Sequence, residues 1–142
     1  MQKRVLSLLV DNTAGVTTRV SGLFSRRGYN IDSITGGVTA DERFSRITVV
    51  CSGDELILEQ ITNQLAKLVD VRDIKILEPD NSGCHELMMI KVAAKPEQRQ
   101  GLISIADVFH AKVADVSVDS MILEMTGNHN KLEAFLELMG DY

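Results

Sequence analysis

The stretch VLSLLVDNTAGVTTRVSGLFSRRG, residues 5–28, decides the fold at the start of the chain. Its first six residues are rich in leucine and valine, which is typical of a buried strand, and Asp11 and Asn12 end that strand with turn-forming side chains. Apolar residues then recur at the spacing of one helix face, and Gly28 stands where helices commonly end. The apolar residues of this face are Val16, Val20, Leu23 and Phe24. The stretch therefore predicts a strand, a loop and a helix with Thr13 as its N-cap.

Two strands, a helix and a further strand follow. Residues 30–39 and 44–51 contain strand-forming runs that are separated by a turn at 41–42. Residues 53–54 open the helix, and residues 69–77 form the last strand of the series. The apolar stripe of the helix consists of Leu58, Ile61, Leu65 and Leu68. The order strand–helix–strand–strand–helix–strand is that of a ferredoxin-like βαββαβ unit.

The pattern begins again after a turn-rich segment at 79–84, which we predict to be a linker. Further strands are expected at 87–94, 113–118 and 121–125. A helix is expected to begin at Pro96. Its buried residues should include Ile103, Val108 and Phe109. Another helix follows 126–128, and its apolar residues are Leu132, Phe135, Leu136 and Met139. Because 126–128 and this helix match 52–54 and the helix there in pattern, the sequence contains an internal structural repeat.

These patterns predict an α+β protein of two tandem ferredoxin-like units, residues 1–78 and 85–142. The repeat places a final strand after Met139, but the sequence ends at Tyr142. We therefore expect the second unit to lack its last strand in this chain, whether the sequence is truncated or the sheet is naturally short. An open sheet edge of that kind favours pairing with another chain.

Composition and charge narrow the function classes. Hydrophobic residues make up 44% of the 142 residues, charged residues 25%, and the net charge is −5, which gives no strong pull toward nucleic acid or anionic membranes. No apolar run approaches the roughly 20 residues of a membrane span, and the N-terminus has no signal-peptide pattern. Cys51 and Cys84 form no disulfide framework, which suits a reducing compartment. We expect a soluble, cytoplasmic protein with no membrane partner.

The sequence carries no signature of a common enzyme class. His85, His110 and His129 show neither metal-ligand spacing nor a link to a nucleophile, so neither a metal site nor catalytic residues are expected. The glycine pair at 36–37 lacks the lysine of a phosphate loop and predicts a strand bend or a close approach of another group to the backbone. RNA-binding sheets of this architecture stack bases on aromatic side chains of their central strands. Because residues 5–10 contain no aromatic side chain, we expect no nucleic-acid partner.

The loop at 11–16 is the candidate binding segment. It joins a buried strand to a helix start, where backbone N–H groups lack intrahelical partners and attract a carboxylate. Gly15 leaves room for a ligand, and the Asn12 side chain offers an acceptor for an ammonium group and a donor for a carboxylate. A free amino acid needs both. The same residues also suit a plain tight turn, and the pattern alone favours neither interpretation.

Several blocks of the sequence resemble the regulatory (small) subunit of acetohydroxyacid synthase, also called acetolactate synthase. The blocks are DNTAGV at 11–16, RVSGLFSRRGYNI at 19–31 and ELMMIKV at 86–92. In that family an Asn and a nearby Gly precede the pattern RV-x-x-LF-x-RRG-[YF]-NI. The resemblance spans nearly the whole chain and identifies the first unit as an ACT domain. The family usually continues into a closing strand and a short basic tail, which this chain lacks.

The resemblance implies a protein without a reaction of its own. Such a subunit binds the thiamine-diphosphate-dependent catalytic large subunit, activates it and makes it sensitive to feedback inhibition by valine or another branched-chain amino acid. We therefore expect no cofactor in this chain. Thiamine diphosphate, Mg and FAD are expected only in the catalytic partner.

The resemblance also implies that the effector lies between the ACT domains of a homodimer. Carried over by position, the effector-binding residues are Asn12, Ala14, Gly15 and Val16 of one chain with Asn30 and Ile31 of the second copy. Two other functions remain open at this point. One is an amino-acid-sensing ACT module that regulates another enzyme, and the other is an assembly scaffold that binds no ligand.

Overall fold

The structure, a computed structural model, describes residues 2–142 and divides into two compact units between Ser82 and Gly83. This division lies inside the segment expected to be a linker. Part of that segment, Pro79–Asn81, forms a short 3-10 helix, η1. Each unit has its own hydrophobic core, so the two are described separately.

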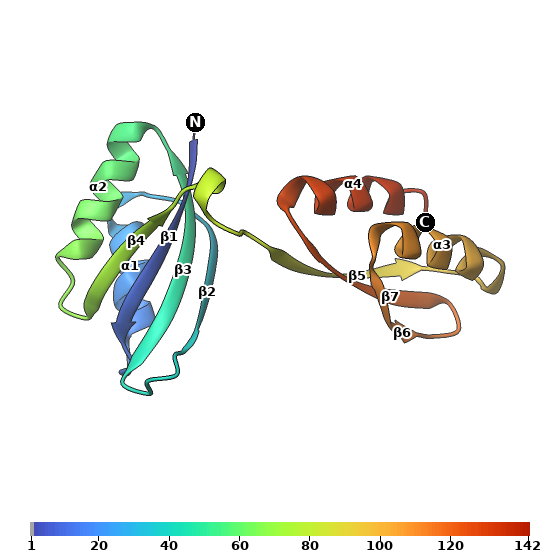
Figure 1. The fold of residues 1–142 in the computed structure, drawn as a ribbon, viewed down its shortest axis with the longest axis horizontal. Helices are drawn as coiled ribbons and strands as arrows, with labels where there is room; N and C mark the ends of the chain where they lie inside the picture. Colours follow the sequence, from blue (N-terminus) through green and yellow to red (C-terminus); the bar gives the residue numbers. More distant parts are fainter. Residues whose placement is uncertain (1) are drawn as a thin grey trace. The chain divides into compact units, whose positions relative to one another are not determined.

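The N-terminal unit is a four-stranded antiparallel sheet with two helices on one face (Figure 1). Its elements are β1 (Gln2–Asp11), α1 (Val16–Arg27), β2 (Ile31–Val38), β3 (Phe44–Gly53), α2 (Glu55–Ala66) and β4 (Val71–Leu77). The strand order is β2-β3-β1-β4, so the two central strands are β3 and β1. The predicted ferredoxin-like order is confirmed.

Alternation along the central strands builds the core of this unit. On β1, Leu6, Leu8 and Val10 are at most 1% exposed and face the helices, while the residues between them face the other side of the sheet. The helices close the core with their predicted apolar faces, and Phe24 of α1 is 1% exposed. Because each fully buried Leu, Val or Phe contributes about 1.5–3 kcal/mol, this face holds α1 and its N-terminus against the sheet. Leu68 was wrongly predicted on the α2 face: α2 ends at Ala66, and Leu68 packs partly buried against the core from the turn that follows.

The start of α1 differs from the prediction. The N-cap is Gly15, in the left-handed conformation at φ 84°, and it makes no side-chain cap hydrogen bond. The prediction of Thr13 as N-cap is therefore wrong, because the chain turns into the helix two residues later than expected. By contrast, the Asp54 side chain caps α2 by accepting a hydrogen bond from the Ile57 N–H at 2.8 Å. The first turn of α1 is thus left without a side-chain acceptor.

The C-terminal unit repeats the architecture without a fourth strand (Figure 1). Its elements are β5 (Glu86–Ala93), η2 (Pro96–Gln98), α3 (Arg99–Phe109), β6 (Lys112–Val116), β7 (Ser120–Gly127) and α4 (His129–Met139). The strand order is β5-β7-β6. β5 occupies the place that β1 has in the first unit, and no strand within residues 2–142 pairs with its other edge, as the sequence predicted.

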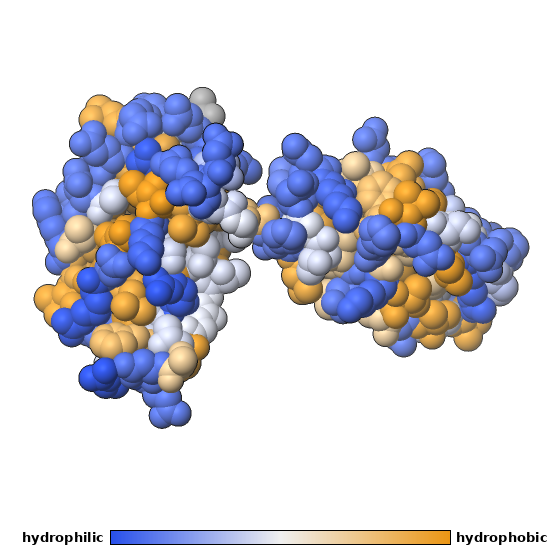
Figure 2. Space-filling model, in the orientation of Figure 1, coloured by the Kyte–Doolittle hydropathy of each residue, from blue (hydrophilic) through white to orange (hydrophobic). Residues whose placement is uncertain are grey.

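One predicted core residue of this unit is exposed. The buried residues of α3 are Leu102 and Ala106, and Phe109 packs beside them, whereas Val108 is 75% exposed. Leu102, Ala106 and Phe109 are spaced by four and three residues and share one helix face, and Val108 lies off that face. The prediction that Val108 is buried is wrong. Exposed apolar side chains are common at protein surfaces, and Figure 2 shows apolar residues (orange) beside hydrophilic ones (blue) on the face that it draws.

Candidate functional site

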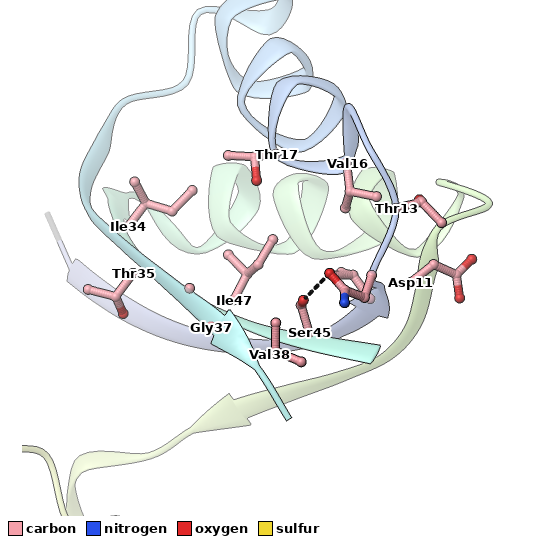
Figure 3. Close-up of a pocket in the computed structure, with 13 residues that line it drawn as sticks. Asp11, Thr13, Val16, Thr17, Ile34, Thr35, Gly37, Val38, Ser45 and Ile47 are labelled. Carbon is pink, nitrogen blue, oxygen red and sulfur yellow. Dashed lines mark hydrogen bonds between the residues drawn. The ribbon is translucent and has the colours of Figure 1, made fainter. Parts of the chain in front are cut away.

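A pocket of about 370 Å³ lies in the N-terminal unit where the loop after β1 enters α1. Three strands and the helix start contribute its walls, and Figure 3 shows the lining residues on the helix start and on the strands that face it. The lining residues are Val10, Asp11, Asn12, Thr13, Val16, Thr17, Ile34, Thr35, Gly36, Gly37, Val38, Ser45 and Ile47. The pocket therefore joins the predicted loop to an edge strand, β2.

Asn12 is the best-anchored polar group of the pocket. Its Nδ2 donates to the Glu42 carbonyl at 2.9 Å, and its Oδ1 accepts from the Ser45 hydroxyl at 3.2 Å (Figure 3). The backbone N–H of Asn12 donates to the Arg43 carbonyl at 2.8 Å. These contacts fix the amide in one orientation, and a primary amide keeps a second N–H and a second lone pair for a ligand.

The first turn of α1 supplies unpaired backbone donors beside Asn12. Helix bonds begin with the Arg19 N–H, which donates to the Gly15 carbonyl at 3.0 Å. The N–H groups of Val16, Thr17 and Thr18 have no hydrogen-bond acceptor within the described residues, and the first turn contains no acidic residue. Since the positive end of the helix dipole is also uncompensated here, this side of the pocket favours a carboxylate.

Aliphatic side chains form another wall of the pocket. Val10, Val16 and Ile47 are 1–4% exposed and form its base, whereas Ile34 and Val38 of β2 are 40% and 59% exposed. Gly36 also faces this wall, and a Cβ added there would contact Ile47 Cγ1 at 3.6 Å. The pocket therefore combines a polar end with an aliphatic wall, and its β2 side is open.

Two bidentate ion pairs lie at the outer side of the loop. Arg19 donates to the Asp70 carboxylate from Nε at 2.5 Å and Nη2 at 3.1 Å, and Arg72 donates to Asp11 at 2.7 and 2.9 Å. The hydrogen bonds from Arg19 hold the pKa of Asp70 below its usual range. Asp11 lines the pocket, but its charge is matched by Arg72, so it adds no uncompensated negative charge at the polar end.

The sequence predicted part of this site. Of the candidate residues, Asn12 and Val16 line the pocket, and Ala14 and Gly15 lie in the same loop beside it without lining it. Asn30 and Ile31 precede and begin β2, before the strand residues 34–38 that line the pocket and at the end of β2 away from Asn12: Ile31 pairs with Cys51, whereas Val38 pairs with Ser45. Ile31 and Val38 are therefore roughly 20 Å apart along the strand. One chain therefore does not bring Asn30 and Ile31 to Asn12, and their role stays a prediction that requires a second copy.

Sequence reasoning missed the strand residues of the pocket. Residues 34–38 and Ser45 enter through the pairing of β2 with β3, in which Val38 lies opposite Ser45. The glycine pair at 36–37 was a usable signal: it was predicted to mark a strand bend or a close approach to the backbone, but it was not assigned to the site.

Two further findings concern metal ions and membranes. Within residues 2–142, no three His, Cys, Asp or Glu side chains are grouped closely enough to hold a metal ion. No helix in that range has both the length and the apolar character needed to cross a membrane.

Comparison with known proteins gives consistent matches along the whole chain. The profile of the AHAS small subunit-like ACT domain matches residues 6–73, and that of the small subunit of acetolactate synthase matches residues 85–142. The chain is 43% identical over 141 residues to a probable acetolactate synthase small subunit of Archaeoglobus fulgidus, covering 99% of this chain and 87% of that protein. It is 47% identical over 137 residues to the acetolactate synthase small subunit of Mycolicibacterium smegmatis, covering 96% and 81%.

A solved structure agrees with both units. The crystal structure of the acetolactate synthase small subunit from Thermotoga maritima superposes with a TM-score of 0.89 at 37% identity. The match covers 97% of this chain and 86% of that one.

Proposed function

The chain belongs to the acetolactate synthase small-subunit family, whose members are non-catalytic regulatory subunits, and from this premise we propose that it activates the catalytic large subunit and confers feedback inhibition by valine or another branched-chain amino acid. The observation that carries the proposal is the pocket at the start of α1, which combines the Asn12 amide, free helix N–H groups and an aliphatic wall. The cofactors of the reaction, thiamine diphosphate, Mg and FAD, then lie in the catalytic partner.

The pocket has one partner for each part of a branched-chain amino acid. The free N–H groups of the first α1 turn and the Asn12 Nδ2 suit the carboxylate, and the Asn12 Oδ1 suits the ammonium group. The aliphatic wall suits an isopropyl or isobutyl side chain, which gains about 25 cal/mol for each Å² of apolar surface that it buries. A charged or strongly polar side chain would lose its hydration against this wall.

The open β2 side of the pocket supports a site that a second copy completes. β2 is an edge strand, and its residues 32–38 are exposed. Two ACT domains that pair along this edge would bring a second chain over the pocket, and Asn30 and Ile31 of that chain are the proposed closing residues. An effector held between two copies stabilises one pairing over a looser or rotated one, and inhibition follows if the catalytic subunit prefers the other. A typical coupling of about 1–3 kcal/mol gives about 5–150-fold regulation.

A thermal-shift panel of amino acids tests the ligand class directly. At about 100 times its dissociation constant, L-valine should add about 2.7 kcal/mol to the unfolding free energy of the N-terminal unit. This corresponds to a rise of roughly 10–20 °C in its midpoint, from about 4–8 °C per kcal/mol for a unit of this size. D-valine and L-lysine are the controls, since one misplaces the ammonium group and the other places a charge against the aliphatic wall. A panel without any stabilising amino acid would refute the proposal.

Removal of the Asn12 amide is a second test. Asn12→Ala should weaken L-valine binding about tenfold or more, because a hydrogen bond to a charged group contributes about 1.5–3 kcal/mol. Activation of the catalytic subunit should persist, and both are measured with the reconstituted enzyme. Ser45→Ala is the matched control, since it removes one contact that holds Asn12 but leaves the amide itself. If Ser45→Ala weakened binding as much as Asn12→Ala, Asn12 would only support the turn.

A further inference from the structure

The outer side of the ligand loop is held by an ion pair that the proposed site does not include. Besides its two hydrogen bonds to Asp70, the Arg19 guanidinium donates from Nη2 to the Ala14 carbonyl at 3.4 Å. Asp70 comes directly before β4, and its own carbonyl accepts from the Asp11 N–H at 2.9 Å. Together with the Arg72–Asp11 pair, these contacts tie both ends of the loop to residues 70–72.

The contact with Ala14 also bears on the direction of the next backbone donor, the Gly15 N–H. In a trans peptide the C=O and the next N–H point in opposite directions, so an Ala14 carbonyl that faces Arg19 turns the Gly15 N–H away from it. The guanidinium lies close against Gly15 as well, since a Cβ added there would be 2.9 Å from Arg19 Nη1. Arg19 therefore fits against the backbone at the point where the loop becomes helix.

We propose that Arg19, paired with Asp70, is a positioning residue for the effector: it keeps the loop at 11–15 and the first α1 turn in the binding conformation before the ligand arrives. This inference rests on the proposed function. Without the pair, binding would have to order the loop, and the ordering cost would appear as lost affinity. Arg19 does not line the pocket, so it acts through the loop and not by contact with the ligand.

The geometry requires an arginine. One planar guanidinium spans both Asp70 oxygens and the Ala14 carbonyl, and the compact ammonium of lysine cannot reproduce this fork. Arg19→Lys therefore keeps the positive charge but loses the hydrogen bonds that reach both Asp70 oxygens and the Ala14 carbonyl together. This variant therefore distinguishes positioning of the loop from the other role that a cation near the site can have, which is long-range electrostatic attraction of the effector carboxylate.

The experiment is a double-mutant cycle on the full chain with Arg19→Lys, Asp70→Asn and the double variant. L-valine affinity is measured by calorimetry at a temperature where circular dichroism shows every variant folded. Each single variant should bind L-valine about fivefold more weakly than the wild type. The double variant should have the same affinity as the single variants, because removal of one partner already breaks the Arg19–Asp70 pair. Glu55→Gln is the matched control, since it breaks the exposed Arg4–Glu55 pair elsewhere in the same unit and should leave the affinity unchanged.

Amide hydrogen exchange without ligand gives a readout that does not depend on valine. Two backbone N–H groups serve as probes: that of residue 11, bonded to the Asp70 carbonyl, and that of residue 19, bonded to the Gly15 carbonyl. Both should exchange at least about threefold faster in Arg19→Lys and in Asp70→Asn. Their exchange rates should be unchanged in Glu55→Gln. Three outcomes would each overturn the inference: exchange rates in both single variants equal to those of the wild type, wild-type valine affinity in Arg19→Lys, or a double variant whose loss of affinity is the product of the two single losses. A wild-type chain that binds no branched-chain amino acid while exchange responds as expected would instead refute the proposed function.

Discussion

Gly15→Asp is expected to lower the affinity for L-valine by about 100-fold or more, equivalent to about 2.7 kcal/mol, while activation of the catalytic subunit persists. Gly15 has φ 84°, a left-handed conformation that costs most side chains about 1–2 kcal/mol. Its new Cβ would lie 2.9 Å from Arg19 Nη1, so the loop or the guanidinium must move. The carboxylate also places negative charge at the helix end proposed to receive the ligand's carboxylate.

Two variants separate these causes. Gly15→Ala has the strain and the close contact without the charge, and should show a smaller loss than Gly15→Asp. Gly28→Ala, at the other end of α1, has the same left-handed backbone at φ 70° but no heavy atom within 4 Å of the added Cβ. It should lower stability and leave valine affinity unchanged. Affinity and activation are measured by calorimetry and by reconstitution with the catalytic subunit. Retention of full valine sensitivity in Gly15→Asp would refute this placement of the site.

Phe135→Ala is expected to lower the unfolding free energy of the C-terminal unit by about 3–5 kcal/mol and to leave the N-terminal unit folded. Phe135 is 0% exposed and packs edge-to-face on Phe109, with ring centroids 5.3 Å apart. Its truncation removes the largest buried side chain of this core. Because the two cores share no residue, valine binding should persist.

Phe24→Ala is the matched variant in the other core. Phe24 is 1% exposed and contacts Tyr29 edge-to-face at 6.3 Å, so its removal should destabilise the N-terminal unit by a similar amount and reduce valine binding with it. Differential scanning calorimetry and amide spectra distinguish the two units. A single cooperative transition that both variants shift equally would contradict independent units.

Much of the fold was predictable from the sequence, because the relevant signals are local. The apolar face of α1 and the alternation along β1 depend on periods of 3.6 and 2 residues that can be counted along the chain. Gly28 and Asp54 stand at helix ends with the backbone and side-chain chemistry expected there. The prediction of Thr13 as the N-cap of α1 was wrong because several residues of one loop can cap a helix, and only the path of the chain selects among them.

The site was only half predictable. Asn12, which lines the pocket, and Gly15, which lies beside it, were predicted because a loop between a buried strand and a helix start has a general chemistry. Their partners come from far along the chain: Ser45 lies 33 positions from Asn12, and Asp70 lies 51 positions from Arg19. No short-range pattern pairs such residues, because sheet register and the docking of α1 on the sheet bring them together.

By itself, then, the sequence determined the order of elements, the faces that enter the two cores and the loop that offers backbone donors. Only the tertiary structure decided that β2 and β3 complete a pocket over that loop, and that Arg19 and Asp70 hold it from outside. The physical reason is range: periodicity and capping act within a few residues, whereas strand pairing and ion pairs join residues that only the folded chain makes neighbours.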